Sequence, residues 1–191
     1  MSSRKILGID PGSLSTGYGI IKTPPLPSPS PQMRDPALAG QEEGYREGSS
    51  DRIAKRSEAH LVICGCLKNK QKIPFSFRFL HIYEGLEEII ARYQPDEVAI
   101  ESIFYHKNVR SALLMGEVRG VALLACQKAN LPIFEYSPLE IKQSVVGTGS
   151  ASKKQIQFMV KTLLRLKESP AEDAADALAV ALCHLHRSRS C

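Results

Sequence analysis

Residues 5–12 read Lys5-Ile6-Leu7-Gly8-Ile9-Asp10-Pro11-Gly12, an apolar run that ends in a carboxylate and a turn. The run predicts a buried strand, and the Pro-Gly pair predicts the turn that follows it. The stretch Thr16-Gly17-Tyr18-Gly19-Ile20-Ile21 predicts a second strand, so that the two form a hairpin. A carboxylate at the end of a buried strand loses its hydration, which is unfavourable unless it has a partner. Asp10 is therefore the first candidate functional residue.

Three further acidic residues lie at points that suggest the same chemistry. Glu101 ends the apolar run Val98-Ala99-Ile100, and Asp173 and Asp176 lie three apart on a stretch with helical spacing. Residues three apart share one face of a helix. Divalent cations are the usual partner of several converging carboxylates. We therefore predict one metal-dependent site built from Asp10, Glu101, Asp173 and Asp176.

The remaining periodicities give the order of elements. They predict strands over 60–67, 97–101 and 131–136 and helices over 74–93 and 108–129. Two helices close the chain, the first introduced by a capping box of Ser152 and Gln155 and the second by one of Ser169 and Glu172. Three antiparallel strands followed by alternating helices and strands predict an α/β mixed sheet with helices on both faces.

This arrangement would place the acidic residues together under two conditions. Asp10 and Glu101 lie side by side if the first and fourth strands are neighbours. Asp173 and Asp176 reach the same place if the last helix lies close to the sheet, which its many alanines would allow. Glu172 has a competing interpretation as a helix-capping residue and is left out of the site.

Residues 24–58 interrupt the pattern. They hold six of the twelve prolines and few large apolar residues, so they have little to bury. A loop this long is either functional or disordered, and the composition favours disorder. We predict a single domain over residues 1–191, because this length suffices for one full core, with the Pro/Ser/Gly-rich segment as an insert.

The distribution of charge and the cysteines indicate the class of substrate and the cellular compartment. The chain has a formal net charge of +5. Residues 24–58 carry five basic and six acidic residues, a charge of −1, so the rest of the chain carries +6. A basic body around an acidic site suits a polyanionic substrate bridged by metal ions. The five cysteines have no zinc-like spacing and are expected to be free thiols rather than disulfides. Without a signal peptide or an apolar run of ~18 residues, we expect a cytoplasmic protein that does not span a membrane.

Several motifs in one order resemble a known family. They are Gly8-Ile9-Asp10-Pro11-Gly12-Ser13, Thr16-Gly17-Tyr18-Gly19, Ala99-Ile100-Glu101-Ser102-Ile103-Phe104, Gly120-Val121-Ala122, Phe134-Glu135-Tyr136, Lys142-Gln143-Ser144-Val145-Val146-Gly147 and Asp173-Ala174-Ala175-Asp176-Ala177-Leu178-Ala179. Together they resemble RuvC, the bacterial family of Holliday-junction resolvases or crossover junction endodeoxyribonucleases, which have an RNase H-like fold. The resemblance covers residues 5–23 and about 60–186, and the insert departs from the family pattern.

The resemblance implies an activity and partners. It implies a homodimer that binds four-way junction DNA and nicks two strands of like polarity symmetrically, in recombination and DNA repair. The implied cofactor is Mg²⁺, with two ions in each active site and Mn²⁺ as a substitute. The RuvA–RuvB branch-migration complex is the implied protein partner. The helix over 108–129 would contribute to the dimer interface, although packing against its own sheet explains its amphipathic pattern equally well.

The resemblance also assigns roles to residues. Catalytic and metal-binding roles fall on Asp10, Glu101, Asp173 and Asp176. Phe104 resembles an aromatic that stacks on a junction base, with a core position as the alternative. The implied DNA contacts are Phe104, Lys107, Arg110, Lys142, Lys153 and Lys154, although Lys154 could equally be a solvated surface residue.

Other classes of protein share parts of the pattern. The first hairpin resembles the phosphate-binding hairpin of actin-like nucleotide-binding proteins, but 191 residues leave little room for their second half. An RNase H-like nuclease acting on structured RNA, of the pre-ribosomal RNA processing type, is a closer alternative. A junction-binding protein without activity is disfavoured because all four carboxylates are present.

Overall fold

A mixed sheet forms the centre of the computed structural model, which describes residues 3–23, 59–102 and 109–188. Its strands are β1 (Arg4–Asp10), β2 (Ser15–Thr23), β3 (His60–Lys68), β4 (Glu97–Glu101) and β5 (Ile133–Tyr136), in the order β3-β2-β1-β4-β5. Strand β2 is antiparallel to both β1 and β3, and β4 and β5 continue the sheet parallel to β1. The predicted α/β sheet is confirmed, including the adjacency of the first and fourth strands.

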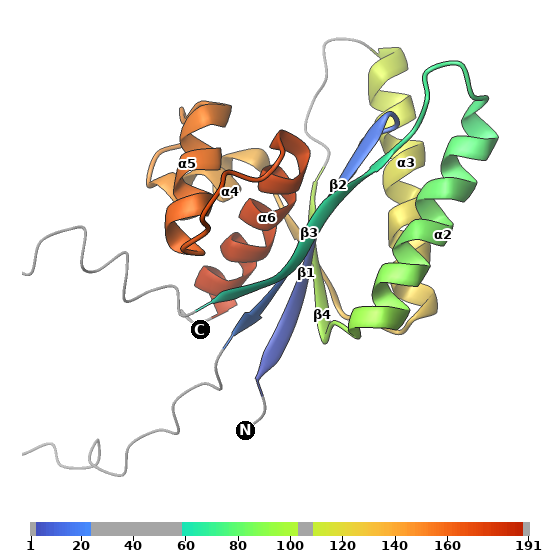
Figure 1. Cartoon of the computed structure of the whole chain (residues 1–191). Helices are drawn as coiled ribbons and strands as arrows, with labels where there is room; N and C mark the ends of the chain where they lie inside the picture. The colour runs from blue at the N-terminus through green and yellow to red at the C-terminus, as the bar shows by residue number, and fades with distance from the viewer. Residues whose placement is uncertain (1–2, 24–58, 103–108, 189–191) are drawn as a thin grey trace, which may run out of the picture.

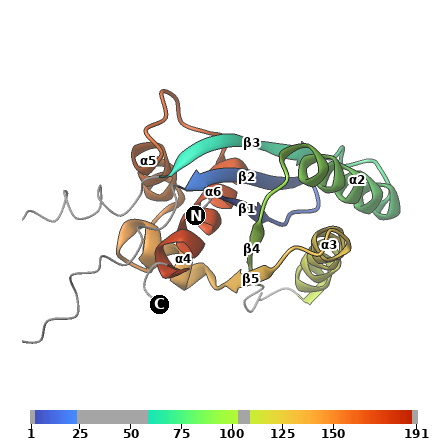
Figure 2. The same cartoon turned by 90° about the horizontal axis from the view of Figure 1, so that it is seen from below.

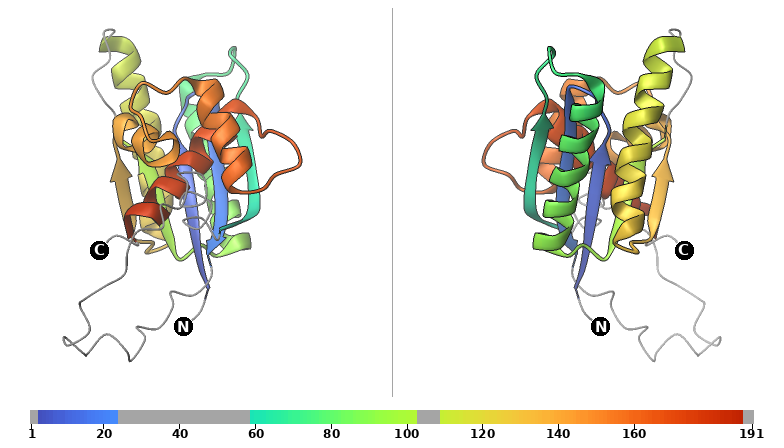
Figure 3. Two further views of the ribbon diagram at one scale, coloured as in Figure 1. Left: turned by 90° about the vertical axis from the view of Figure 1, so that its left-hand side faces the viewer. Right: turned by 90° about the vertical axis from the view of Figure 1, so that its right-hand side faces the viewer.

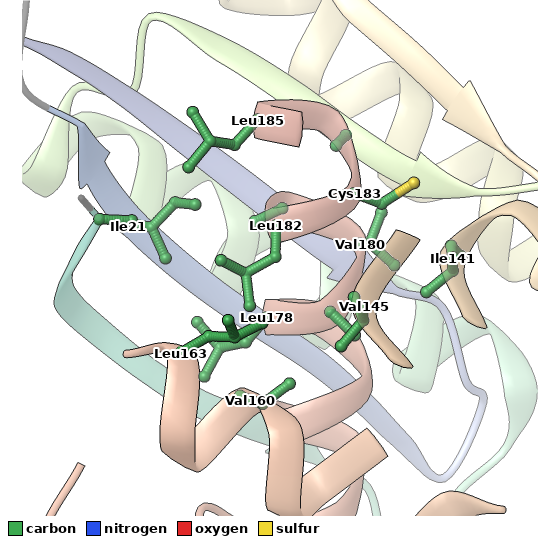
Figure 4. Close-up of a cluster of buried hydrophobic side chains, with 14 of the residues drawn as sticks. Ile21, Ile141, Val145, Val160, Leu163, Leu178, Val180, Leu182, Cys183 and Leu185 are labelled. Carbon is green, nitrogen blue, oxygen red and sulfur yellow. The ribbon is translucent and has the colours of Figure 1, made fainter. Parts of the chain in front are cut away.

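Helices cover both faces of this sheet, as predicted (Figures 2 and 3). On one face lie α2 (Phe75–Tyr93) and α3 (Val109–Lys128). On the other lie α4 (Pro138–Val146), α5 (Lys153–Leu163) and α6 (Glu172–Ser188) (Figure 1). Each face has its own apolar core, and α6 lies at the centre of the second. Figure 4 shows Leu178 and Leu182 of α6 in that core, together with Ile21 of β2.

The sequence interpretation missed one helix and misplaced the start of another. Helix α4 was not predicted, although Ser137 and Glu140 form a capping box with proline at the first helical position. The capping box of Ser152 and Gln155 is confirmed at the start of α5. The one predicted at Ser169 is wrong, because α6 begins only at Glu172.

Helix α6 lies directly on the sheet because glycines of β1 and β2 face it. A Cβ atom added at Gly8 would overlap with the carbonyl oxygen of Ala177, and one added at Gly17 would overlap with that of Asp173. One added at Gly19 would lie 2.5 Å from a methyl group of Leu178. Glycine is therefore required on the strands for the backbones to approach this closely, as the small residues of the helix had suggested.

A buried polar cluster ties α6 to the sheet at the opposite end from Asp10. His184 is 2 % exposed, and its Nε2 lies 3.0 Å from Oε2 of Glu97, the first residue of β4. The Nδ1 of His184 lies 2.6 Å from the hydroxyl of Tyr136. Arg4 closes the cluster, with its Nε 2.6 Å from Oε1 of Glu97. Ion pairs and hydrogen bonds of this kind fix side chains because an unpaired buried charge is unfavourable.

Helix α3 differs from the amphipathic pattern predicted for it. Val118, Ala122 and Cys126 face the core, but large apolar residues also lie on the outer side. Val109, Leu113 and Leu124 are 72 %, 64 % and 61 % exposed. The helix is thus apolar on two faces, and its own sheet covers only one of them.

Three further expectations from the sequence concern the insert, membrane-spanning helices and the cysteines. The disorder predicted for residues 24–58 falls outside the described residues. In the part of the chain that the structure describes, no helix has the length and apolar character needed to cross a bilayer. Cys64, Cys66, Cys126 and Cys183 are free thiols, as expected.

Candidate functional site

Asp10 and Glu101 lie next to each other at the ends of two parallel strands. Ile9 pairs with Ile100 in the sheet, so the residue that follows each of them ends its strand at the same edge. The carboxylates of Asp10 and Glu101 share a hydrogen bond. The sheet therefore produces the first half of the predicted site directly from the register of β1 and β4.

Helix α6 brings the other two carboxylates to this edge. Asp173 lies in its first turn, with its backbone against Gly17, and Gly17 pairs with Asp10 across the hairpin. Asp176 follows one turn later and lines the same pocket as Asp10 and Glu101. Acidic residues in the first turn of a helix are stabilised by its dipole. In Figure 1 this first turn, in red, lies at the end of the sheet where β1 turns into β2.

The pocket at this edge combines acidic, basic and apolar walls. It has a volume of about 280 Å³. The residues that line it are Asp10, Glu101, Pro138, Ile141, Lys142, Lys153, Ile156, Asp176 and Ala179. Asp173 acts on the pocket through its charge rather than as a lining residue.

The electrostatics show how strongly these carboxylates affect one another. Burial raises the pKa of Asp10 from 3.8 to about 8, and the charges of Glu101, Asp176 and Asp173 add to the rise. Burial and the charge of Asp176 raise the pKa of Glu101, whereas the hydrogen bond from Asp10 lowers it. Burial also raises the pKa of Asp176, against the opposing effect of Lys153. Burial and the neighbouring negative charges therefore favour the protonated form of Asp10, and a bound cation would favour its ionised form instead.

Two lysines, Lys142 and Lys153, supply the positive charge of the pocket. Lys142 is carried by α4 and lies among the residues that line the pocket. Lys153 begins α5, and its Nζ lies 2.5 Å from Glu172 and 3.8 Å from Asp176. Its pKa is raised, chiefly by the hydrogen bond to Glu172. The sequence interpretation did not foresee that Glu172 serves as the partner of this lysine.

The chemistry of the donor set fits a hard divalent cation. The titratable residues that line the pocket are carboxylates and lysines, so the ligands that it offers are all oxygen atoms, which Mg²⁺ and Mn²⁺ prefer. In the described ranges, no three His, Cys, Asp or Glu side chains lie close enough to ligate one ion as they stand. The contact between Asp176 and Lys153 accounts for part of this spacing, since Asp176 would exchange the ammonium group for the ion.

The structure places the predicted DNA contacts unequally. Lys142 and Lys153 lie at the pocket, whereas Lys154 is exposed and does not line it. Phe104 and Lys107 fall outside the described residues, and so does the side chain of Arg110.

Thr16 contributes to the site in a way that the sequence interpretation did not single out. The buried hydroxyl of Thr16 donates to the carbonyl oxygen of Gly12 at 2.7 Å and so fixes the turn that follows Asp10.

Comparison with known proteins supports one family. A family model described as crossover junction endodeoxyribonuclease RuvC matches residues 44–184. The RuvC of Pelotomaculum thermopropionicum is 43 % identical, with 95 % of this chain and 92 % of the relative covered. That of Shewanella pealeana is 44 % identical over 97 % of this chain and 88 % of its own.

A solved structure agrees with the sequence relatives. The Thermus thermophilus RuvC in complex with a Holliday junction substrate superposes with a TM-score of 0.75 at 28 % identity, covering 98 % of this chain and 96 % of that one. The RNase H-like fold expected from the sequence is therefore confirmed. With its mixed sheet, its acidic edge and this similarity along nearly its whole length, the chain belongs to the RuvC family of crossover junction endodeoxyribonucleases.

Proposed function

We propose that this protein resolves Holliday junctions by magnesium-dependent nicking of two strands of like polarity. The observation that carries the proposal is the convergence of Asp10, Glu101 and Asp176 in one pocket beside two lysines. The complex of the Thermus thermophilus relative with a Holliday junction supports the substrate, because that protein shares the fold over almost the whole chain. Asp173 completes the set through its charge on Asp10.

Each residue of the pocket has a separate task in this proposal. Asp10, Glu101, Asp173 and Asp176 would hold the metal ions, for which Asp10 must be ionised. Lys142 and Lys153 bind the negative phosphate backbone at the pocket, which positions the strand. When bound, two Mg²⁺ ions supply an activated water and stabilise charge on the leaving oxygen. The apolar wall of Ile141 and Ile156 limits the access of other water to the pocket.

The test compares substrates and metals directly. The protein is incubated with a synthetic four-way junction, a linear duplex of the same sequence and a structured RNA, each with Mg²⁺, with Mn²⁺ or with EDTA. We expect paired, symmetric nicks in the junction with either metal and intact substrates in EDTA. Preferential cleavage of the RNA would instead support the ribosomal-type nuclease, and cleavage of none would contradict the proposal.

The outer face of α3 supports a homodimer in which both active sites act on one junction. Leu113 and Leu124 are exposed on this face, and Gly116 and Gly120 lie between them and are exposed as well. A Cβ atom at Gly120 would meet nothing within 4 Å, so the surface there is open to a neighbour. A two-fold dimer pairs the same patch on both subunits, and small residues let two helices approach closely.

Charge introduced on this face tests the dimer. Leu113→Lys and Leu124→Lys are expected to shift the protein from dimer to monomer in sedimentation experiments and to uncouple the two nicks. Leu139→Lys, on the exposed side of α4, is the matched control, since Leu139 is 55 % exposed. Equal behaviour of all three variants would exclude α3 as the interface.

A further inference from the structure

A second group of cations lies at the catalytic end of the sheet, outside the carboxylate pocket. The connection from β3 to α2 carries Lys68, Lys70 and Lys72, all of them exposed; residues 68–72 are called the basic turn. We propose that the basic turn binds phosphates of a junction arm and so extends the DNA contact surface beyond the pocket lysines. This inference rests on the proposed function.

The register of the sheet sets where the basic turn lies. Lys68 pairs with Ser15 across β3 and β2, and Ser15 is the first residue after the turn that follows Asp10. Strand β2 lies between β3 and β1, which separates the two strands by roughly 10 Å at 4.8 Å per strand. A duplex presents one negative charge per ~1.7 Å of its axis, so a strand bound at Asp10 has further phosphates within this distance. Figure 1 shows the connection, in green, at the same end of the molecule as the β1–β2 turn.

The basic turn is held in place by the hairpin that carries Asp10. The backbone N–H of Asn69 donates to the carbonyl oxygen of Leu14 at 2.8 Å, and its side-chain amide donates to that of Ser13 at 3.2 Å. The amide oxygen of Asn69 also lies 2.9 Å from Nδ1 of His81 on α2. The backbone that carries the lysines is therefore held in a defined position relative to the edge where Asp10 lies.

A buried arginine fixes the other half of the basic turn. The guanidinium of Arg78, in α2, donates to the carbonyl oxygen of Gln71 and, at 2.7 Å, to that of Ile73. Arg78 is only 7 % exposed, so its charge stabilises the turn and is not offered to a ligand. Binding by a pre-ordered turn avoids the entropy of ordering a loop when the ligand arrives.

The charges of the basic turn have no partner among the described residues. Lys68, Lys70 and Lys72 form no ion pair or side-chain hydrogen bond there, whereas Lys128 and Lys153 are both paired with glutamates. The sequence from 59 to 83 contains no acidic residue. Exposed, unpaired cations beside an acidic pocket favour a polyanion as the ligand over a protein surface, and DNA supplies regularly spaced charge.

The test is the salt dependence of junction binding. The triple variant K68Q/K70Q/K72Q is compared with the unmodified protein on a four-way junction in Ca²⁺ or EDTA, across a series of salt concentrations. Each phosphate contact contributes a slope of about −0.9 to log K against log[salt]. We expect the slope to become less steep by about two to three for the triple variant, with weaker binding at every low-salt point.

A control of equal charge separates local contact from general attraction. K22Q/R92Q/K128Q also removes three exposed cations, but Lys22, Arg92 and Lys128 lie at the ends of β2, α2 and α3 that face away from the pocket (Figure 1). For this control, the slope of log K against log[salt] is expected to differ by less than about one from the slope of the unmodified protein. An equal change in the two variants, or no change in the triple variant of the basic turn, would overturn the proposal.

The rate of nicking distinguishes failure of this inference from failure of the proposed function. At limiting protein with Mg²⁺, the triple variant of the basic turn is expected to nick the junction more slowly because it binds less of it, whereas K22Q/R92Q/K128Q is expected to nick at the unmodified rate. If the unmodified protein neither binds nor nicks the junction, the proposed function itself is wrong. If it does both and the two triple variants bind alike, only the role of the basic turn is wrong.

Discussion

Gly17 and Asp173 touch through their backbones: there is no room for even a methyl group between β2 and the first turn of α6 at this point. Gly17 also pairs with Asp10 in the hairpin, so this single contact sets how far the carboxylates of the helix stand from that of the strand. The position of the site thus depends on a residue that carries no functional group.

Gly17→Ala is expected to lower both stability and nicking. The added methyl group would overlap with the carbonyl oxygen of Asp173, so α6 would have to shift, and overpacking of this kind costs about 1–3 kcal/mol. Gly19→Ala on the same strand is the control, because its methyl group would overlap with the buried side chain of Leu178 and not with the backbone of a carboxylate residue. Thermal melts and single-turnover nicking should show a loss of activity beyond the loss of stability only for Gly17→Ala.

Substitution of the carboxylates is expected to separate binding from cleavage. Asp10→Asn, Glu101→Gln and Asp173→Asn should each reduce Mg²⁺-dependent nicking by about 100-fold or more, and Asp176→Asn should reduce it strongly. Junction binding in EDTA should be unchanged or tighter, because less negative charge faces the phosphates.

Glu84→Gln, on the exposed side of α2, is the control for these changes and should leave nicking unaltered. Single-turnover nicking and an electrophoretic binding assay measure the two properties. A residue whose amide variant nicks at the normal rate does not belong to the site.

The raised pKa of Asp10 predicts how stability changes with pH in the absence of metal. Because the pKa rises from 3.8 unfolded to about 8 folded, the folded protein binds more protons between these values. Stability contributed by this group is therefore present below about pH 4 and falls as the pH rises towards 8. Melting in EDTA should show this decline between pH 5 and 8, and Asp10→Asn should lessen it.

Addition of Mg²⁺ is expected to reverse that trend. The cation competes with the proton of Asp10, so its stabilising effect should increase with pH. A Tm that rises equally with Mg²⁺ at pH 5 and pH 8 would show that Asp10 is not a ligand. The Asp10→Asn protein provides the reference for ions bound elsewhere.

Deletion of residues 26–56 with a short Gly-containing bridge should leave the fold and nicking largely intact. Lys22 pairs with His60, so β2 and β3 bring the two ends of the segment together without help from it. The deleted residues are rich in proline and poor in large apolar side chains, which leaves little to offset their ordering entropy. Aggregation or loss of junction binding would show instead that the segment packs on the domain or contacts DNA.

The sequence was most informative where local pattern and chemistry agreed. Asp10 and Glu101 could be placed because each ends an apolar strand, and parallel neighbours end at one edge. Helix α4 was missed because it has only nine residues, too few for a clear helical period, although Ser137 and Glu140 marked its start. Glu172 was misassigned because a capping pattern and a first-turn acid have the same spacing, and only the structure shows Lys153 beside it.

Hydrophobic periodicity could not predict the exposed apolar face of α3 or the position of the basic turn, for a different reason. Leu113 and Leu124 follow helical spacing whether a helix is buried on one side or two, so the pattern does not say which face is covered. The three lysines of the turn are unremarkable in sequence. Their significance depends on the hydrogen bonds of Asn69, which join two segments that are 55 and 56 residues apart along the chain.

The contact between His184 and Glu97 gives α6 a second attachment, at the far end of the sheet from the pocket. Glu97 begins the strand that Glu101 ends, and His184 lies eight residues after Asp176, roughly 12 Å along the helix axis. The same strand and the same helix thus meet twice, once through a buried histidine and once through the acidic edge. Helix α6 cannot turn about its axis or slide without breaking one of these two contacts, so the spacing of the acidic residues is maintained in part by a histidine at the other end of the helix.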